Sequence, residues 1–249
     1  MAYRIYGPAL QATGEVSNGM DIWVKSTEAM VIDKWYRDDL AGVKSYHRDH
    51  GEGVDFYKVG PTLGLGMTAP LHDGKLCLGK NFTEAEILDI GPLRIAMKFK
   101  YAPYKVGERE VAETRIISLD AYEQLNKVVN IFDADVPELT LATGIVTPGD
   151  GSEPVFGDTS GGIIAYEVPA DANYGTIYTG AVNAMGYEEI KRSGGHFMGV
   201  NRYETGKPYT YHAGGGWSRH GFTGGFGQWT DYLKNLRIRL DNPLKVEVK

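Results

Sequence analysis

The sequence has 249 residues, a formal net charge of −6 and one cysteine. A chain of this length can bury a core without disulfide bonds, and β-sandwiches of this size often form one unit, so we expect a single domain over residues 1–249. The acidic balance and the absence of Lys/Arg clusters argue against a nucleic-acid-binding protein. We find no apolar run near the ~20 residues that cross a bilayer, and no signal peptide.

Glycine and the aromatic residues are the most informative part of the composition. The chain contains 33 glycines, 16 tyrosines and 4 tryptophans. Glycine suits tight turns, and aromatic rings with polar groups suit surfaces that stack on sugars. Aromatic residues are also common in strands because they pack well there. The composition therefore predicts a β-rich protein and leaves sugar binding as one of two explanations for the aromatic residues.

Strand patterns dominate the chain from its start. The first two predicted strands are 3–6 and 21–25. The clearest alternation of apolar and polar residues lies in 93–101, and we expect this strand to form an antiparallel meander with 111–119 and 124–132. Further strands are predicted at 139–146, 161–168, 176–182, 197–203 and 209–213.

Helix is scarce in the sequence. The best candidate is 227–236, in which Trp229, Leu233 and Leu236 share one helical face. A short strand is predicted at 244–248, and two long surface loops at 149–162 and 184–195. These elements predict an all-β fold, a large antiparallel β-sandwich with one short C-terminal helix.

Two segments, 45–58 and 209–220, concentrate histidines, tyrosines and charged residues. Residues 45–58 have the composition of a loop. The pattern of 209–220 is typical of a strand that runs into a glycine turn at 214–216. Because strand ends and the loops after them present catalytic side chains, we expect the two segments to line one cleft.

Three interpretations of these segments remain open. The histidines could be hydrogen-bonded structural residues. A divalent ion such as zinc could be held near His47, Asp49 and His50, although their spacing is not diagnostic. Alternatively, an imidazole and a tyrosine hydroxyl could move protons while Arg or Lys neutralises a substrate carboxylate. No nucleophile elbow, phosphate-binding loop or dinucleotide fingerprint is present.

Several segments together resemble one known family. They are 3–10, 19–25, 46–60, 91–94, 141–145 and 213–246. In this order they are similar to a bacterial domain-of-unknown-function family, number 4861, over nearly the whole chain.

The resemblance implies a β-sandwich of the galactose-mutarotase-like supersandwich kind. It also implies a periplasmic or extracellular protein in a setting of polysaccharide breakdown, with uronic-acid polymers as targets and a dehydratase or lyase activity. Family members continue upstream of the motif at 3–10, so upstream strands of the full family domain would be missing from this chain.

We therefore expect a carbon–oxygen lyase or dehydratase that acts on uronic-acid-containing oligosaccharides by His/Tyr acid–base elimination, without a cofactor. The expected catalytic residues are His47, His212, Tyr46 and Tyr211. The expected substrate-binding residues are Trp23, Lys25, Arg48, Lys58, Trp217, Arg219 and His220. The alternatives are a glycoside hydrolase, whose two carboxylates the sequence cannot locate because their separation in space defines them, and a non-catalytic carbohydrate-binding domain.

Overall fold

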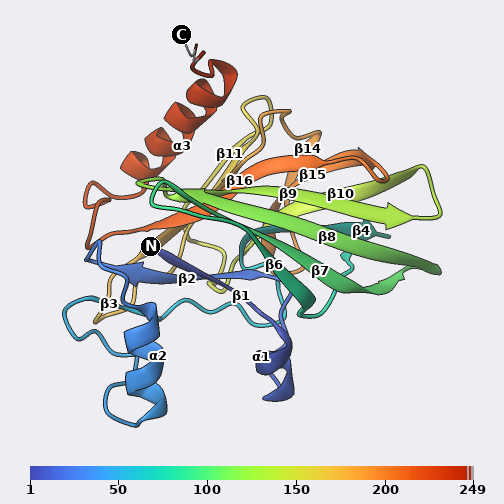
Figure 1. Ribbon diagram of the computed structural model, residues 1–249. Coiled ribbons are helices and arrows are strands. Elements are labelled where there is room, and N and C mark those ends of the chain that lie inside the picture. Colours follow the sequence, from blue (N-terminus) through green and yellow to red (C-terminus); the bar gives the residue numbers. More distant parts are fainter. Residues whose placement is uncertain (246, 248–249) are drawn as a thin grey trace.

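The computed structural model describes residues 1–245 and 247, and it contains three antiparallel sheets (Figure 1). The strands of the largest sheet, in spatial order, are β11 (Val155–Asp158), β12 (Ile163–Glu167), β13 (Ile177–Val182), β16 (Tyr209–Trp217), β9 (Leu125–Ala134), β8 (Arg109–Asp120), β7 (Arg94–Val106) and β6 (Phe82–Ile90). The second sheet consists of β14 (Glu189–Ser193), β15 (His196–Glu204), β10 (Glu138–Val146), β4 (Leu65–His72) and β5 (Lys75–Leu76).

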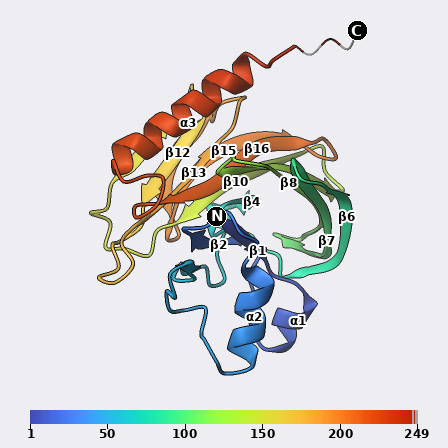
Figure 2. The same ribbon diagram turned by 60° about the vertical axis from the view of Figure 1, so that its left-hand side comes forward.

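A third, small sheet lies near the amino terminus, and three helices complete the fold. The small sheet consists of β1 (Ala2–Ile5), β2 (Met20–Lys25) and β3 (Gly53–Val54). The helices are α1 (Pro8–Ala12), α2 (Ile32–Leu40) and α3 (Phe226–Asp241). Figure 2 shows α3 on one side of the molecule and α1 and α2 on the other. No helix of the described residues is long and apolar enough to cross a membrane.

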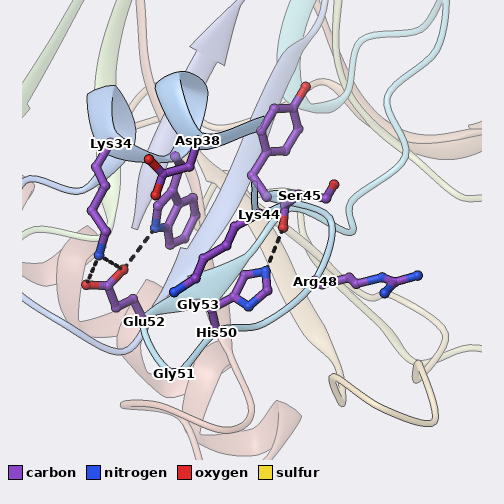
Figure 3. A pocket seen from close by; sticks show the side chains of 11 residues that line it. Lys34, Asp38, Lys44, Ser45, Arg48, His50, Gly51, Glu52 and Gly53 are labelled. Atoms are coloured by element: carbon purple, nitrogen blue, oxygen red, sulfur yellow. Dashed lines mark hydrogen bonds and ion pairs between the residues drawn. The ribbon is translucent and has the colours of Figure 1, made fainter. Parts of the chain in front are cut away.

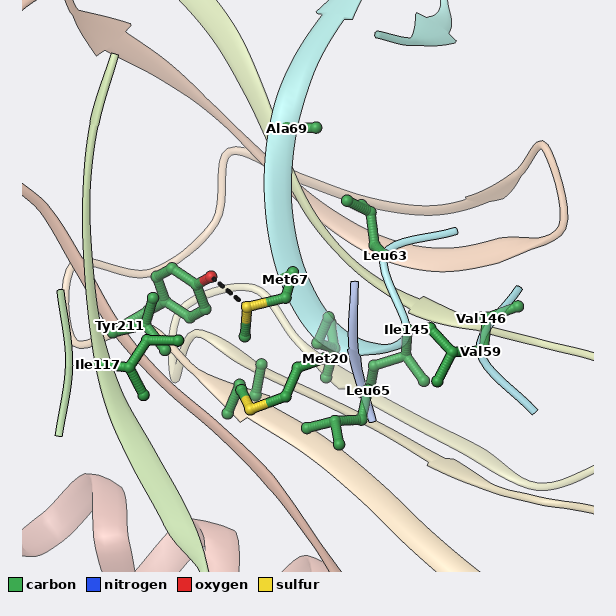
Figure 4. Packing of buried hydrophobic residues seen from close by; sticks show 14 of the residues in the cluster. Met20, Val59, Leu63, Leu65, Met67, Ala69, Ile117, Ile145, Val146 and Tyr211 are labelled. Atoms are coloured by element: carbon green, nitrogen blue, oxygen red, sulfur yellow. Dashed lines mark hydrogen bonds between the residues drawn. The ribbon is translucent and has the colours of Figure 1, made fainter. Parts of the chain in front are cut away.

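The eight- and five-stranded sheets enclose the main hydrophobic core. Side chains from both sheets meet there, such as Tyr211 of β16 and Met67 of β4 (Figure 4). Inward positions alternate along each strand, as with Val128, Asn130 and Phe132 of β9. The prediction of an all-β antiparallel sandwich is therefore confirmed, as is the meander of β7, β8 and β9.

The small sheet packs on this core through one face of β2. Met20, Ile22 and Val24 belong to the core, while Asp21, Trp23 and Lys25 alternate onto the outer face. Gly214 and Gly215 of β16 make this packing close. A Cβ on Gly215 would lie only 2.7 Å from Ile22 Cδ1. The glycines 214–216 are not the predicted turn, because they continue β16 as far as Trp217. Gly216 leaves room for Phe222.

Helix α3 covers the outer face of the eight-stranded sheet. Trp229, Leu233 and Leu236 pack against that sheet, as their helical spacing predicts. A Cβ on Gly180 of β13 would lie 2.6 Å from Leu233 Cδ1, so this glycine allows the helix to approach. The predicted helix is confirmed and is longer at both ends than expected.

Other elements differ from the sequence prediction. Helix α2 was not predicted, although Ile32, Trp35 and Tyr36 share the face that packs on Trp23. The two predicted long loops each contain an edge strand, β11 and β14 respectively. The predicted strand at 244–248 falls partly outside the described residues.

A buried ion pair links the small sheet to the sandwich. Arg115 and Glu113 of β8 are fully buried, with Arg115 Nη2 at 2.6 Å from Glu113 Oε1. Arg115 Nη1 also donates to the backbone oxygen of Asn18 at 3.0 Å, two residues before β2. Asn130 Nδ2 donates to Glu113 Oε1 at 2.7 Å. This network therefore positions the start of β2 against β8.

Replacing Arg115 with Met should destabilise the protein strongly. The change leaves the Glu113 carboxylate buried without its partner, which typically costs about 3–5 kcal/mol of unfolding free energy. Urea denaturation measures this loss. The double variant Arg115→Met/Glu113→Gln should recover part of it, because no unpaired charge remains. Equal stability of the single variant and the wild type would contradict the structural role of the pair.

Candidate functional site

The outer face of the small sheet carries a group of titratable side chains that includes two buried acids, Asp21 and Asp55. The β1–β2 register places Arg4 opposite Asp21, so both point to this face. Asp55 follows β3 directly, and His47 lies in the loop between α2 and β3. We call this group the His47–Asp55 site; it comprises Arg4, Tyr6, Asp21, Tyr46, His47 and Asp55.

The Asp21 carboxylate holds the site together. Its Oδ2 atom lies 3.0 Å from Arg4 Nη2 and accepts a hydrogen bond from Trp23 Nε1 at 3.1 Å. Its Oδ1 atom accepts from the backbone nitrogen of Ile22 at 2.8 Å. Asp21 is only 1% exposed. Burial raises the pKa of Asp21 to about 6, although Arg4 favours the charged form.

Asp55 is the second buried acid of the site. It is 4% exposed. Burial and the neighbouring charge of Asp21 raise the pKa of Asp55 to about 8, against the opposing effects of Arg4 and Lys58. Two carboxyl groups that share a buried region resist ionising together. Asp55 is therefore largely protonated near neutral pH while Asp21 is paired with Arg4.

His47 lies above Asp55 and faces solvent. Its Nδ1 atom is 3.1 Å from the Asp55 backbone oxygen and 3.6 Å from Asp55 Oδ2, and its side chain is 56% exposed. A carbonyl oxygen can only accept, so Nδ1 carries the hydrogen and Nε2 of the neutral ring is the free acceptor. The backbone of Asp55 thus orients an exposed imidazole with its basic nitrogen available.

Aromatic rings form the wall beside His47. Trp23 stacks on Tyr46 and on Trp35, with ring centroids 4.5 Å and 6.0 Å apart. Tyr46 also contacts His47, at 4.5 Å between ring centroids. Trp23 is 2% exposed, so it has no free face. The prediction that Trp23 stacks on a sugar is corrected, because Trp35 and Tyr46 already cover its ring. Tyr46 itself is half-buried.

Tyr211 and His212 do not join this site. Neighbouring residues of a strand point to opposite faces, so Tyr211 enters the core while His212 turns to the outer face of the eight-stranded sheet. Tyr211 is 1% exposed, and burial raises its pKa. Burial, with a smaller effect of Lys127, lowers the pKa of His212 to about 4. The prediction of one centre shared by His47 and His212 is therefore wrong.

The end of β16 does approach the site, by way of the loop between β12 and β13. Trp217 Nε1 donates to the backbone oxygen of Tyr174 at 2.7 Å, and the Tyr174 hydroxyl lies 3.5 Å from the backbone oxygen of His47. Trp217 is 2% exposed, so it cannot stack on a sugar as predicted. Arg219 is exposed beside this loop, and His220 is also exposed.

The predicted cationic residues surround the site. Lys25 shares the outer face of β2 with Asp21, and burial lowers its pKa. Lys58 is exposed, and its charge acts on Asp55. His47, Asp49 and His50 do not converge: Asp49 Oδ1 accepts from Gly51 N at 2.8 Å, and His50 Nε2 lies 3.2 Å from the Ser45 oxygen. Among the described residues, no three potential ligands gather to hold a metal ion.

A small pocket adjoins the site between α2 and the loop 44–53 (Figure 3). Its volume is about 160 Å³. Arg48, which was predicted to bind substrate, lines this pocket together with Tyr46. We call it the α2 pocket; its lining residues include Lys34, Trp35, Asp38, Lys44, Ser45, Tyr46, Arg48, His50 and Glu52.

The sequence prediction missed Arg4, Tyr6, Asp21 and Asp55. All four lie in the segments that carry the family resemblance or in the polar segment 45–58. A signal was present, since Asp21 is a charged residue between apolar neighbours of a predicted strand. Only the β1–β2 register, however, shows that Arg4 lies opposite it.

The lowered pKa of His212 predicts a loss of stability in acid. The folded pKa is about 4, below the ordinary 6.5, so the stabilisation is present above about pH 6.5 and is lost as pH falls through about 4. Relative to His212→Gln, the wild type should lose up to about 3 kcal/mol of unfolding free energy across this window. Urea denaturation at several pH values measures the difference, and parallel pH profiles would refute the assignment.

The raised pKa of Asp55 predicts the opposite slope. Its folded pKa is about 8, above the ordinary 3.8, so the stabilisation is fully present below about pH 4 and is lost progressively as pH rises from there through about 8. Asp55→Asn stays neutral. Between about pH 5 and about pH 9 the wild type should therefore lose up to about 4 kcal/mol of unfolding free energy relative to this variant. Thermal and urea unfolding at matched pH test this, and a constant difference would show that Asp55 is ionised in the folded protein.

Comparisons with known proteins agree with the motif resemblance. The family model described as "Domain of unknown function (DUF4861)" matches residues 1–246. A relative from Formosa agariphila, "Uncharacterized protein P7", is 28% identical over 262 residues; the match covers 100% of this chain and 65% of that protein. A solved structure described as "Putative kojibiose phosphorylase from human microbiome" aligns with a TM-score of 0.43 and 12% identity over 75% of this chain and 31% of its own. Because the family model covers nearly the whole sequence, the chain belongs to the DUF4861 family.

Proposed function

We propose that the protein is a carbohydrate-active lyase or dehydratase that eliminates the oxygen substituent at C4 of a uronic acid unit, with His47 as the general base. The observation that carries this proposal is the orientation of His47. Its Nδ1 is held at 3.1 Å from the Asp55 backbone oxygen, and more than half of the side chain is exposed. A fixed tautomer with an accessible acceptor nitrogen is what a general base requires.

Each step of the elimination has a matching group in or beside the site. His47 Nε2 takes the proton from C5, and the electron pair of that C–H bond forms the C4=C5 double bond. The C4–O bond breaks, and the leaving oxygen takes the hydroxyl proton of Tyr46. The leaving group is water where the C4 oxygen is a free hydroxyl, and a sugar alcohol where it is glycosidic.

The charges around His47 support this chemistry. The proton at C5 becomes acidic only when the adjacent carboxylate is neutralised, and Lys58 is an exposed cation close enough to act on Asp55. Burial raises the pKa of Tyr46, which keeps its hydroxyl protonated as an acid must be. When His47 gains a proton, its new charge favours ionisation of Asp55 Oδ2, 3.6 Å away.

The other two functions fit the geometry less well. A glycoside hydrolase needs two carboxyl groups that reach the substrate, but the pair in this site, Asp21 and Asp55, is 1% and 4% exposed. A binding module would present aromatic faces to solvent, but Trp23 and Trp217 are each 2% exposed. The exposed group in the site is the imidazole, which favours proton transfer.

Activity on oligouronates tests the proposal. The wild-type protein should produce the ultraviolet absorbance of a conjugated C4=C5 double bond. His47→Ala should slow this reaction by about 10²–10⁴-fold, because the general base is lost. Tyr46→Phe should slow it without changing the fold, as checked by circular dichroism.

His72→Ala provides a matched control, because His72 is an exposed histidine at the end of β4, outside the site. Its rate should equal that of the wild type. Release of reducing ends without new absorbance would show that the protein hydrolyses the substrate and does not catalyse elimination. Full activity of His47→Ala would remove His47 from the reaction.

A further inference from the structure

We propose that the α2 pocket binds a second sugar unit that carries an oxyanion, either a carboxylate or a sulfate ester, next to the unit that reacts at His47. That the ligand is a sugar rests on the proposed function. That the ligand carries an oxyanion is inferred from the charges of the pocket itself, where Lys44 is its main partner.

The charges in the pocket leave a positive centre. Lys34 Nζ binds both oxygens of Glu52 at 2.8 Å, so these two charges compensate each other. Asp38 Oδ1 accepts from Arg37 at 3.4 Å. The side chains of Lys44 and Arg48 form no ion pair or hydrogen bond with any residue that the structure describes. The hydrogen bond from Lys34 and, more weakly, the charge of Lys44 lower the pKa of Glu52. The pocket is thus lined by three cations and two carboxylates (Lys34, Lys44, Arg48, Asp38 and Glu52), and this positive excess favours an anionic group.

Lys44 occupies the central position. Figure 3 shows its side chain between the Lys34–Glu52 pair and His50. His50 Nε2 donates to the Ser45 backbone oxygen at 3.2 Å, so Nδ1 of the neutral ring is an acceptor and is free for a sugar hydroxyl group. Arg48 lies at the rim (Figure 3). A sugar unit with its oxyanion at Lys44 Nζ would thus have a partner for one of its hydroxyl groups in His50 Nδ1.

The size and walls of the pocket suit one sugar unit. A volume of about 160 Å³ is below the roughly 300–1,000 Å³ of pockets for larger ligands. Tyr46, which is half-buried, contributes aromatic surface beside the charged groups, a combination that suits a ring with an apolar face and a polar edge. Trp35 is only 7% exposed, so it closes the wall without offering a stacking face. The pocket therefore fits a single charged ring better than an oligosaccharide.

Tyr46 connects the pocket to the His47–Asp55 site. It lines the pocket, and its ring lies 4.5 Å from that of His47. Its backbone oxygen also accepts from the Asp55 nitrogen at 2.9 Å. A sugar unit in the pocket would thus lie beside the residue proposed as the acid, where the neighbouring unit of an oligosaccharide chain would be expected.

Calorimetric titration with three sugars of the same ring tests the subsite: glucuronate, glucose 6-sulfate and glucose. At least one charged sugar should bind about tenfold or more tightly than glucose, because only it supplies an oxyanion to Lys44. The preferred charged sugar identifies carboxylate or sulfate as the natural group. Equal binding of all three, or no binding of either charged sugar, would overturn the proposal.

Variants then locate the binding. Lys44→Ala should weaken the binding of the charged sugar by about tenfold or more, whereas Lys44→Arg should retain most of the affinity. Lys105→Ala, which removes an exposed lysine from β7, is the matched control and should bind like the wild type. If Lys44→Ala does not fold, Arg48→Ala provides the second test, with weaker binding expected. Unchanged affinity in the folded variant would overturn the subsite.

Two further variants separate this proposal from the proposed function. Lys58→Ala should leave binding at the α2 pocket intact, and so should His47→Ala, although the latter abolishes elimination. If His47→Ala keeps its activity while Lys44→Ala loses binding, the elimination fails and the subsite stands. If charged sugars bind through Lys58 instead of Lys44, the subsite fails and the elimination stands.

Discussion

The Asp21 carboxylate is the interaction on which the His47–Asp55 site depends. It joins Arg4 of β1, the Trp23 ring of β2 and the backbone of Ile22 in one buried group. A buried carboxylate is tolerated only when charged and polar partners surround it. Those partners come from β1, from β2 and from the aromatic cluster under α2. The need to pair the Asp21 carboxylate therefore holds the two strands together, orients the Trp23 ring in the wall of the site and keeps a charged group beside Asp55.

The sandwich serves mainly as a support for this small sheet. The glycines of β16 let Ile22 approach, and Arg115 holds the segment before β2 through Asn18. The chemistry then lies on the face of the small sheet that the core does not use, where a loop supplies His47. This division, in which a rigid β scaffold carries polar groups on a loop, explains how a protein with a closely packed interior can present an accessible imidazole.

The sequence predicted the sandwich well and the site only in part. Strands with clear alternation, such as β7 and β8, follow from local pattern because one face must be buried. Tyr46, His47 and Lys58 could be named as candidates from the sequence because they lie close together in one polar loop, and their roles stay predictions. The pairing of His47 with His212 failed because strand alternation sends Tyr211 and His212 to opposite faces, and a histidine-rich segment does not reveal which face closes on another loop. Asp21 and Arg4 were missed because each is a single charge in an apolar strand, and only the register between β1 and β2 brings them together.

The raised pKa of Asp55 can be interpreted through its neighbour His47. An acid with a pKa of about 8 is largely neutral near pH 7, so the two buried acids of the resting site carry one negative charge, that of Asp21, which Arg4 balances. Protonation of His47 places a positive charge 3.6 Å from Asp55 Oδ2, which lowers the free energy of the carboxylate form. Gain of a proton by His47 therefore favours loss of the proton from Asp55. A buried acid that is largely neutral near pH 7 presents no competing carboxylate to an anionic substrate, and the charge that proton abstraction places on His47 then favours its ionisation.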